Sequence, residues 1–232
     1  MTNSLFSLAR MTKIFAKYHT FYFDGLKNTL SISFFAVFIG LGLGLLLAFG
    51  RMSKIHPLRW ICTAYVEVVR STPLLVQAMI IYYGSTAMNL KFSNANFNVF
   101  FWGLIVVGLN SGAYMSEVIR GGIGAVPGGQ MEAARAIGMT HWQAMRHVVL
   151  PQAVRNILPA MANEFVTIIK ETSVLSIIGV ADIMFRTGDV TSVTYFYFEP
   201  YIIAALMYFV VVFPLSKLVA LFERRMNKSV TR

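Results

Sequence analysis

The chain has few charged residues and almost no cysteine. Only 13% of its 232 residues are charged, and Cys62 is its single cysteine. One cysteine excludes an intrachain disulfide framework and a cysteine-based metal cluster. Globular domains carry about 25% charged residues. The shortage of charge therefore argues against a water-soluble enzyme and favours a protein whose surface lies largely in an apolar environment.

Sequence patterns that bind nucleotide or zinc, or that present a catalytic serine, are also missing. No lysine follows a glycine, so the phosphate-binding loop GxxxxGK[ST] does not occur. The HExxH and GxSxG motifs are absent, and His141 and His147 are not spaced as a zinc-binding pair. We therefore expect no catalytic residue, metal or cofactor in this chain, and we interpret its 4 histidines as packing or interfacial residues.

Long apolar segments make up much of the sequence. The chain is 56% hydrophobic, with a mean hydropathy of +0.63. A helix needs about 20 apolar residues to cross a hydrocarbon layer of about 30 Å. The predicted fold is therefore all-α, a polytopic membrane protein with five transmembrane helices and a cytoplasmic helical hairpin. The five spans are predicted at residues 30–50, 62–85, 97–116, 158–178 and 200–222.

The whole chain, residues 1–232, is interpreted as a single membrane domain. In residues 1–23, apolar side chains recur every three or four positions beside a basic face. This pattern predicts a helix in the membrane interface, with a partly ordered tail as the alternative. Residues 24–222 are expected to form the five-span core, including a cytoplasmic loop at about 117–157. Residues 223–232 are expected to form a basic cytoplasmic tail.

The 20 basic residues indicate an orientation. Twelve of them lie in segments on the same side as the C-terminus, six lie on the opposite side, and Arg70 and Lys170 lie within spans. Cytoplasmic segments carry the excess of lysine and arginine. We therefore predict an external N-terminus and a cytoplasmic C-terminus. The position of the basic residues beside apolar spans also argues against a nucleic-acid partner.

The loop between the third and fourth spans is predicted to form two short helices. A carboxylate near a helix start is favoured by about 0.3–1 kcal/mol, which suits Glu132. Gly138 permits a bend, and Thr140 can cap a second helix that runs to Leu150. Pro151 is expected to break the chain before the fourth span. Such a hairpin would form a compact projection for a partner protein.

This loop resembles the EAA motif of binding-protein-dependent ABC importer permeases. Glu-Ala-Ala at 132–134, Gly138, Val148, Leu150 and Pro151 occupy its spacing. Flanking segments resemble the polar amino acid branch of that family, and the resemblance extends from Gly25 to Arg225. These flanking segments are residues 70–77, 113–122, 129–130, 150–153 and 170–173.

The resemblance implies both partners and cargo. In that family the hairpin is a coupling helix that enters a cleft of a cytoplasmic ATPase. It implies two ATPase subunits that hold ATP and Mg²⁺, a second permease chain, an extracytoplasmic amino-acid-binding protein, and localisation in the cytoplasmic membrane. It implies polar amino acids as cargo, and residues 192–201 resemble permeases for basic ones. The residues implied in coupling are Glu132, Ala133, Ala134, Gly138, Leu150 and Pro151.

The fourth span contains charged residues, which indicate a path for substrate. A charge at the bilayer centre costs about 2.5–3.5 kcal/mol on insertion scales, so such residues face water, a partner charge or a substrate. Glu164 is the candidate to bind the ammonium group or a cationic side chain of an amino acid. A gate, an internal ion pair and helix packing are alternative roles for it. The residues expected to line the path are Glu164, Asn163, Lys170, Asn110, Ser111, Tyr82 and Gln77.

Two other functions compete with this interpretation. A gradient-driven secondary transporter would use the charges of the fourth span as a relay, but it leaves the EAA loop unexplained. A non-transporting membrane scaffold that docks an ATPase would explain the loop, but not the charged residues within a span.

Overall fold

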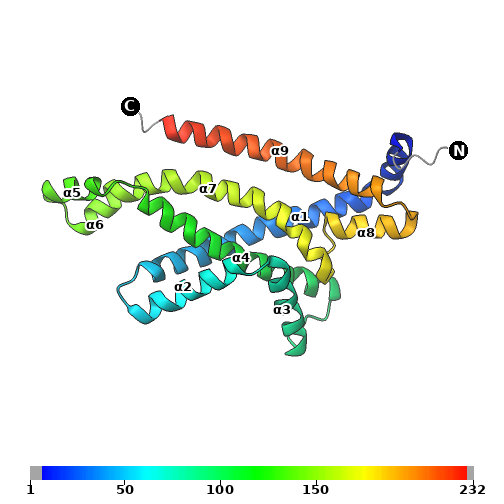
Figure 1. Cartoon of the computed structure of the whole chain (residues 1–232), viewed down its shortest axis with the longest axis horizontal. Coiled ribbons are helices and arrows are strands. Elements are labelled where there is room, and N and C mark those ends of the chain that lie inside the picture. Colours follow the sequence, from blue (N-terminus) through cyan, green and yellow to red (C-terminus); the bar gives the residue numbers. More distant parts are fainter. Residues whose placement is uncertain (1–6, 229–232) are drawn as a thin grey trace. The chain divides into compact units, whose positions relative to one another are not determined.

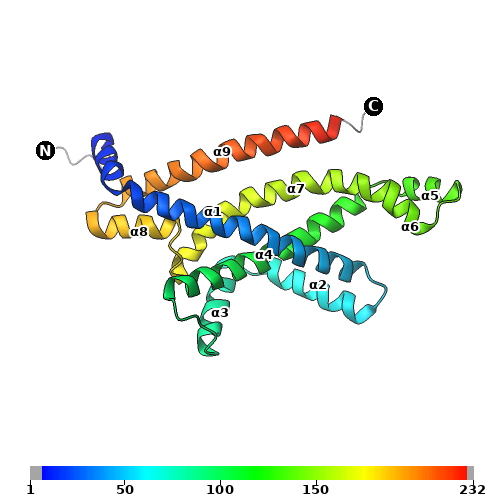
Figure 2. The same ribbon diagram turned by 180° about the vertical axis from the view of Figure 1, so that it is seen from behind.

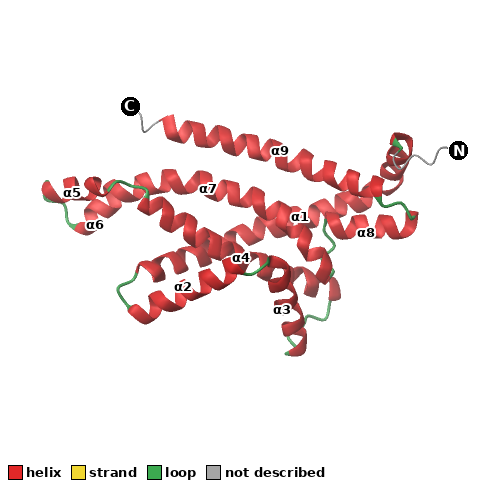
Figure 3. Cartoon of the chain, in the orientation of Figure 1, coloured by secondary structure: helices red, strands yellow, loops and turns green. Residues whose placement is uncertain are grey.

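The computed structural model describes residues 7–228, and within that range every regular element is helical (Figure 3). The outer ends of the predicted N-terminal helix, residues 1–6, and of the basic tail, residues 229–232, lie outside the described residues. The elements are α1 (Leu8–Met52), α2 (His56–Ser71), α3 (Leu74–Ala87), α4 (Ala95–Gly124), α5 (Gly128–Ala136), α6 (His141–Ala144), the π-helical turn η1 (Met145–Val149), α7 (Leu150–Glu171), the 3₁₀ helix η2 (Thr172–Ile178), α8 (Ile183–Thr194) and α9 (Phe198–Lys228).

Among the described residues, three helices, α1, α4 and α9, are long and apolar enough to cross a membrane. The number rises to four if α2 and α3, a bent pair, count as one broken span. The predicted fourth span is divided between α7 and η2. Charged side chains at Glu164, Lys170 and Glu171 lower its hydropathy, so its crossing of the membrane stays a prediction.

The predicted second span, residues 62–85, is not one straight helix. It is interrupted between Ser71 and Leu74, and Pro73 is the N-cap of α3 with φ −63° and ψ 138°. Proline lacks a backbone N–H and disfavours helical geometry in the residue before it. The helix therefore ends before Thr72 and begins again after Pro73.

No helix end separates the predicted interfacial helix from the first span. α1 is continuous over 45 residues, across the predicted boundary at residue 23. No proline interrupts α1, and a helix without proline or a cap can continue through short polar stretches. Helix α8, whose N-cap is Asp182, was not predicted from the sequence.

The chain divides into two compact units. The first comprises Met1–Ala36, Thr72–Gly108 and Thr167–Leu215, described from Ser7 onward. In this unit the beginnings of α1 and α9 and the helix α8 pack together around Tyr22 and Ile203 (Figure 1). Arg10 forms an ion pair of 2.9 Å with the buried carboxylate of Glu199, which joins the start of α1 to the start of α9.

The second unit comprises Val37–Ser71, Leu109–Val166 and Ser216–Arg232, described as far as Lys228. Figure 2 shows α2 beside the end of α1, and Leu47 of α1 packs against Cys62 and Val66 of α2. Gly40 and Gly44, four residues apart, lie against the side chains of Ser111 and Met115 on α4. The two glycines, four residues apart, therefore allow α1 and α4 of the same chain to pack closely.

Candidate functional site

The loop between α4 and α7 forms a helical hairpin, as the sequence predicts. Figure 1 shows α5 and α6 folded back on each other at the start of α7. Gly138 lies in the turn with φ +96°, a conformation that favours glycine. Thr140 caps α6: its hydroxyl accepts a hydrogen bond from the Gln143 N–H, and the Gln143 side chain accepts one from the Thr140 N–H at 2.8 Å. This reciprocal pair fixes the entry into α6.

The start of the hairpin differs from the expectation. α5 begins at Gly128, so Gly128 and Gly129 are helical rather than a flexible entry, and Glu132 is the fifth residue of the helix. Pro127 precedes α5 as its N-cap and sets this earlier start. The helix dipole favours a carboxylate in the first turn. Glu132 lies beyond that turn and does not gain this stabilisation. Its side chain is exposed, as is that of Ala133, whereas Ala134 is buried.

Pro151 does not break the helix, contrary to the sequence-based expectation. The helical run continues from His141 to Glu171, and Pro151 is the second residue of α7. A proline ring clashes with the carbonyl group four residues earlier, and the wider π-helical turn of η1 directly precedes it. Leu150 is 42% exposed, and Pro151 is also exposed.

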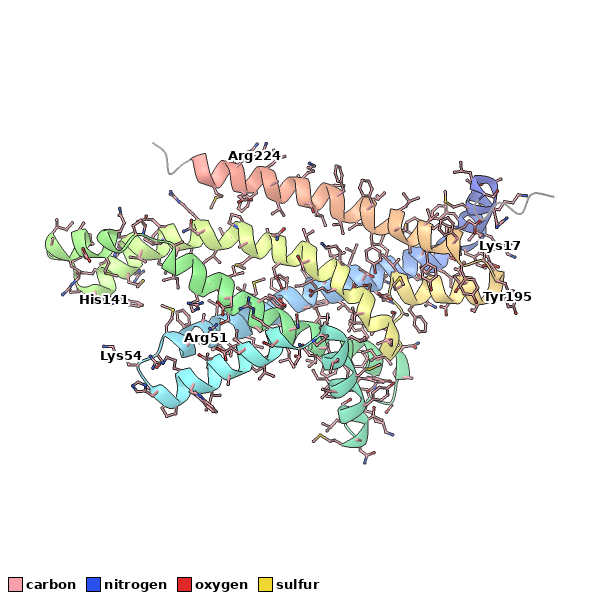
Figure 4. All side chains as sticks on the ribbon, viewed as in Figure 1. Lys17, Arg51, Lys54, His141, Tyr195 and Arg224 are labelled. Atoms are coloured by element: carbon pink, nitrogen blue, oxygen red, sulfur yellow. The ribbon has the colours of Figure 1, made fainter. Side chains whose placement is uncertain are left out.

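The hairpin also exposes two large apolar side chains that the sequence analysis did not single out. Ile137 is 77% exposed in the turn, and Trp142 is 70% exposed on α6. A hollow of about 380 Å³ next to the turn is lined by Ile137, Gly138, Met139, Gln143 and His147. Figure 4 shows His141, the first residue of α6, in this hairpin. Exposed apolar groups beside a hollow are typical of a protein-binding surface.

The predicted path residues fall in both units. In the second unit, Asn110 and Ser111 are buried, and the Ser111 hydroxyl lies against Gly40 of α1. Ser111 therefore packs against α1 in this unit, and its place on the substrate path stays a prediction. On α7, Glu164 is half-buried and Asn163 is exposed.

In the first unit, Lys170 lines a hollow of about 360 Å³ together with Ser173, Val174, Met184 and Tyr208. Gln77 instead donates hydrogen bonds to the Thr72 carbonyl group at 3.0 Å and to the Thr72 hydroxyl at 2.9 Å. Gln77 thus stabilises the non-helical backbone between α2 and α3. The half-buried ring of Tyr82 packs edge-on against Tyr83.

A carboxylate on α4 holds three arginines, which the sequence analysis did not bring together. Glu117 pairs with Arg51 at 2.8 Å, with Arg120 at 2.7 Å and with Arg70 at 3.3 Å. Arg70 also lies over the ring of Tyr114, 5.5 Å from its centre. These contacts join the ends of α1, α2 and α4 in the second unit.

Known proteins are similar to most of this chain. Residues 40–228 match the family model of the binding-protein-dependent transport system inner membrane component. The chain is 42% identical over 207 residues to a Rickettsia conorii protein named "Putative glutamine transport system permease protein GlnP", covering 89% of this chain and 93% of that protein. It is 40% identical over 210 residues to the Bacillus subtilis arginine transport system permease protein ArtQ, covering 90% and 94%.

A solved structure agrees with the sequence matches. The crystal structure of an amino acid ABC transporter with histidines matches this fold with a TM-score of 0.85 and 47% sequence identity, covering 90% of this chain and 96% of that chain. The family model covers far more than half of the 232 residues. The chain therefore belongs to the binding-protein-dependent transport system inner membrane components, the permease subunits of ABC importers.

Proposed function

We propose that this chain is the transmembrane permease subunit of an ATP-driven importer of polar amino acids. The hairpin of α5 and α6 carries this proposal, because it presents an exposed Glu132 beside exposed Ile137 and Trp142 on a capped turn. Relatives named for glutamine and arginine transport support the class of cargo. Amino acids with a basic side chain are the first cargo to test.

The hairpin would couple the permease to a cytoplasmic ATPase subunit. A rigid-body movement is transmitted through a packed element that does not deform, and the Thr140 capping box together with the buried Ala134 stiffens this one. Glu132, Ala133 and the Gly138 turn would enter the ATPase cleft, while Leu150 and Pro151 would lead the movement into α7. ATP and Mg²⁺ would bind to two such ATPase subunits.

The substrate path would run beside α7. The carboxylate of Glu164 would bind the ammonium group or the basic side chain of the amino acid, with Asn163 one position away in the sequence. Lys170 lines a hollow further along the same helix and would bind a carboxylate group of the substrate. A second permease chain would complete the path, and an external binding protein would deliver the amino acid.

The proposed orientation places the N-terminus outside and the C-terminus in the cytoplasm. It rests on the excess of basic residues at the ends of α1 and α9 and in the hairpin region. In this orientation α5 and α6 face the cytoplasm, where an ATPase subunit is available.

The decisive experiment measures uptake of labelled arginine, histidine and glutamine by cells that express the complete transporter. Glu132→Lys reverses the charge on the hairpin, and Glu223→Lys makes the same change at an exposed position of α9. We expect uptake to require ATP, to be lost in Glu132→Lys and to persist in Glu223→Lys. Co-purification of the ATPase subunits should fall only in Glu132→Lys.

A different outcome would reject the proposal. Uptake that follows the proton gradient and survives Glu132→Lys would identify a secondary transporter. Normal membrane insertion of both variants, measured by protein level in the membrane fraction, ensures that a loss of uptake reflects coupling rather than folding.

A further inference from the structure

A basic hollow of about 540 Å³ lies in the second unit, where the end of α1 meets α2 and α4. We call it the arginine hollow. Its walls come from the last turn of α1, the first two turns of α2 and the last part of α4. The residues that line it are Arg51, His56, Arg59, Trp60, Thr63 and Arg120.

Positive charge exceeds negative charge around the arginine hollow. Glu117 accepts ion pairs from Arg51, Arg70 and Arg120. Arg59 forms no ion pair with any carboxylate in residues 7–228, and its guanidinium group contacts the His56 ring at 3.0 Å. Even when the exposed Glu67 of α2 is counted together with Glu117, the neighbouring arginines outnumber the carboxylates. The excess of positive charge would attract an anion to this site.

One hydrogen-bond donor in the wall lacks a partner. The Arg51 side chain is only 10% exposed, and its Nη1 atom donates to Glu117. Its Nε atom is buried and has no hydrogen-bond partner in the described part of the chain. An unpaired buried donor costs about 1–3 kcal/mol, but this atom is closed off from solvent, so Arg51 contributes positive charge to the hollow rather than a free donor.

The apolar side of α2 indicates what kind of anion binds. Leu58, Trp60 and Ile61 are 42%, 73% and 60% exposed next to the hollow. Tryptophan is enriched where the apolar part of the bilayer meets its headgroups, and the hollow lies at the end of the 45-residue apolar helix α1. A soluble anion would leave this apolar surface uncovered, whereas the acyl chains of a lipid would cover it.

We propose that the arginine hollow binds the phosphate headgroup of an anionic phospholipid. Arginine offers planar pairs of donors that match phosphate oxygens, and basic pockets between membrane helices are typical sites for such headgroups. Arg51, Arg59 and Arg120 supply the positive charge, and Trp60 packs against the first part of an acyl chain. The lipid holds α2 against the ends of α1 and α4.

The test uses the full-length chain in detergent and phospholipids brominated on their acyl chains, which quench nearby tryptophan fluorescence. The part of the quenching that disappears in Trp60→Phe reports on the arginine hollow. We expect this part to saturate with brominated phosphatidylglycerol at much lower concentration than with brominated phosphatidylcholine. Because a surface charge contributes about fivefold to binding of an anionic lipid, Arg59→Gln should raise the half-saturating concentration about fivefold.

Lys54→Gln is the matched control, because it removes one positive charge three residues after Arg51. Lys54 is exposed in the loop between α1 and α2 and does not line the hollow (Figure 4). It should leave the half-saturating concentration unchanged. Arg59 makes no ion pair with any described residue, so its substitution should leave the thermal unfolding temperature in lipid-free detergent within the range of the control.

Three outcomes would overturn the proposal. Equal saturation by phosphatidylcholine would show that the surface lacks headgroup preference. Displacement of the brominated lipid by millimolar inorganic phosphate or glycerol phosphate would assign the hollow to a soluble anion. Displacement by added ATPase subunits would assign it to a protein partner. The measurement involves no transport, so its failure would not bear on the proposed importer function.

Discussion

Gly25 of α1 lies directly against the main chain of Asp182. A Cβ atom on Gly25 would come within 2.8 Å of the Asp182 carbonyl oxygen and within 2.9 Å of the Ile183 Cα atom. Next to this contact, the Asn28 side chain donates to the Ala181 carbonyl group at 2.8 Å. The start of α8 thus packs on α1 through backbone atoms. These atoms cannot move aside for an added methyl group as the end of a flexible side chain can.

The first prediction follows from this contact. Gly25→Ala should lower the free energy of unfolding by about 1–3 kcal/mol, because the added methyl group would overpack the joint between α1 and α8. Gly42→Ala is the control in the same helix, since nothing lies within 4 Å of its Cβ position. The control should be neutral or slightly stabilising. Thermal unfolding in detergent measures both, and equal stability of the two variants would contradict the prediction.

The second prediction concerns the turn of the hairpin. Gly138 has φ +96°, and a residue with a Cβ atom in this region is strained by about 1–2 kcal/mol. Gly138→Ala should therefore loosen the turn, weaken co-purification of the ATPase subunits and reduce uptake. Gly129→Ala should have little effect on either measurement, because Gly129 is an exposed helical residue with open space around it. Identical behaviour of the two variants would show that the turn conformation is not needed.

The third prediction addresses the substrate path. Glu164→Gln removes a half-buried charge of α7 with almost no change of shape. If Glu164 binds the cationic group of the substrate, a loss of about 1.4 kcal/mol should reduce uptake at limiting concentration about tenfold. Glu223→Gln is the control at an exposed position. Wild-type uptake and selectivity in Glu164→Gln, with normal assembly, would remove Glu164 from the path.

The fourth prediction is a pH dependence. Asp182 lies in the connection between η2 and α8, outside the predicted spans, and burial raises the pKa of its carboxyl group to about 7. One oxygen caps α8 by accepting from the Phe185 N–H at 2.8 Å. The other oxygen, Oδ2, is buried without a hydrogen-bond partner among the described residues. The ionised form is therefore unfavourable in the folded protein.

The number of protons bound to the folded and unfolded states decides whether stability rises or falls with pH. Between about pH 4 and pH 7 the folded state holds a proton on Asp182 that the unfolded state has released, so folding stability falls as the pH rises. Asparagine caps helices as well as aspartate does and does not titrate. The advantage of Asp182→Asn should thus grow from near zero at pH 4 to on the order of 2–4 kcal/mol at pH 8. An advantage that is constant across this range would contradict the assigned pKa.

Local features of the hairpin could be predicted from the sequence because they depend on neighbours along the chain. A glycine with positive φ and a threonine cap are decided within four residues, and both appear at Gly138 and Thr140. The positions of α4 and α9 follow for a similar reason, since a long apolar run must form a helix in a membrane. The exposed Ile137 and Trp142 could have been found as the two bulkiest apolar residues of the hairpin, next to its predicted turn.

Other features of the site depend on residues far apart in the sequence. The contact of Arg51 with Glu117 joins positions 66 residues apart, and that of Asn28 with Ala181 joins positions 153 apart. No periodic pattern in the sequence indicates which of these distant residues will pair. The burial of Ser111 against Gly40 likewise arises only when α1 and α4 pack, so the sequence did not predict it.

The sequence by itself determined that the chain is helical and apolar, where its hairpin turns, and to which family it belongs, because hydropathy, turn chemistry and motif spacing are local properties. Only the tertiary structure decided which charged groups face one another. It placed three arginines around Glu117 and left Asp182 buried at the start of α8. The physical reason is that burial and ion pairing depend on packing between helices, which brings together side chains that are distant in the sequence.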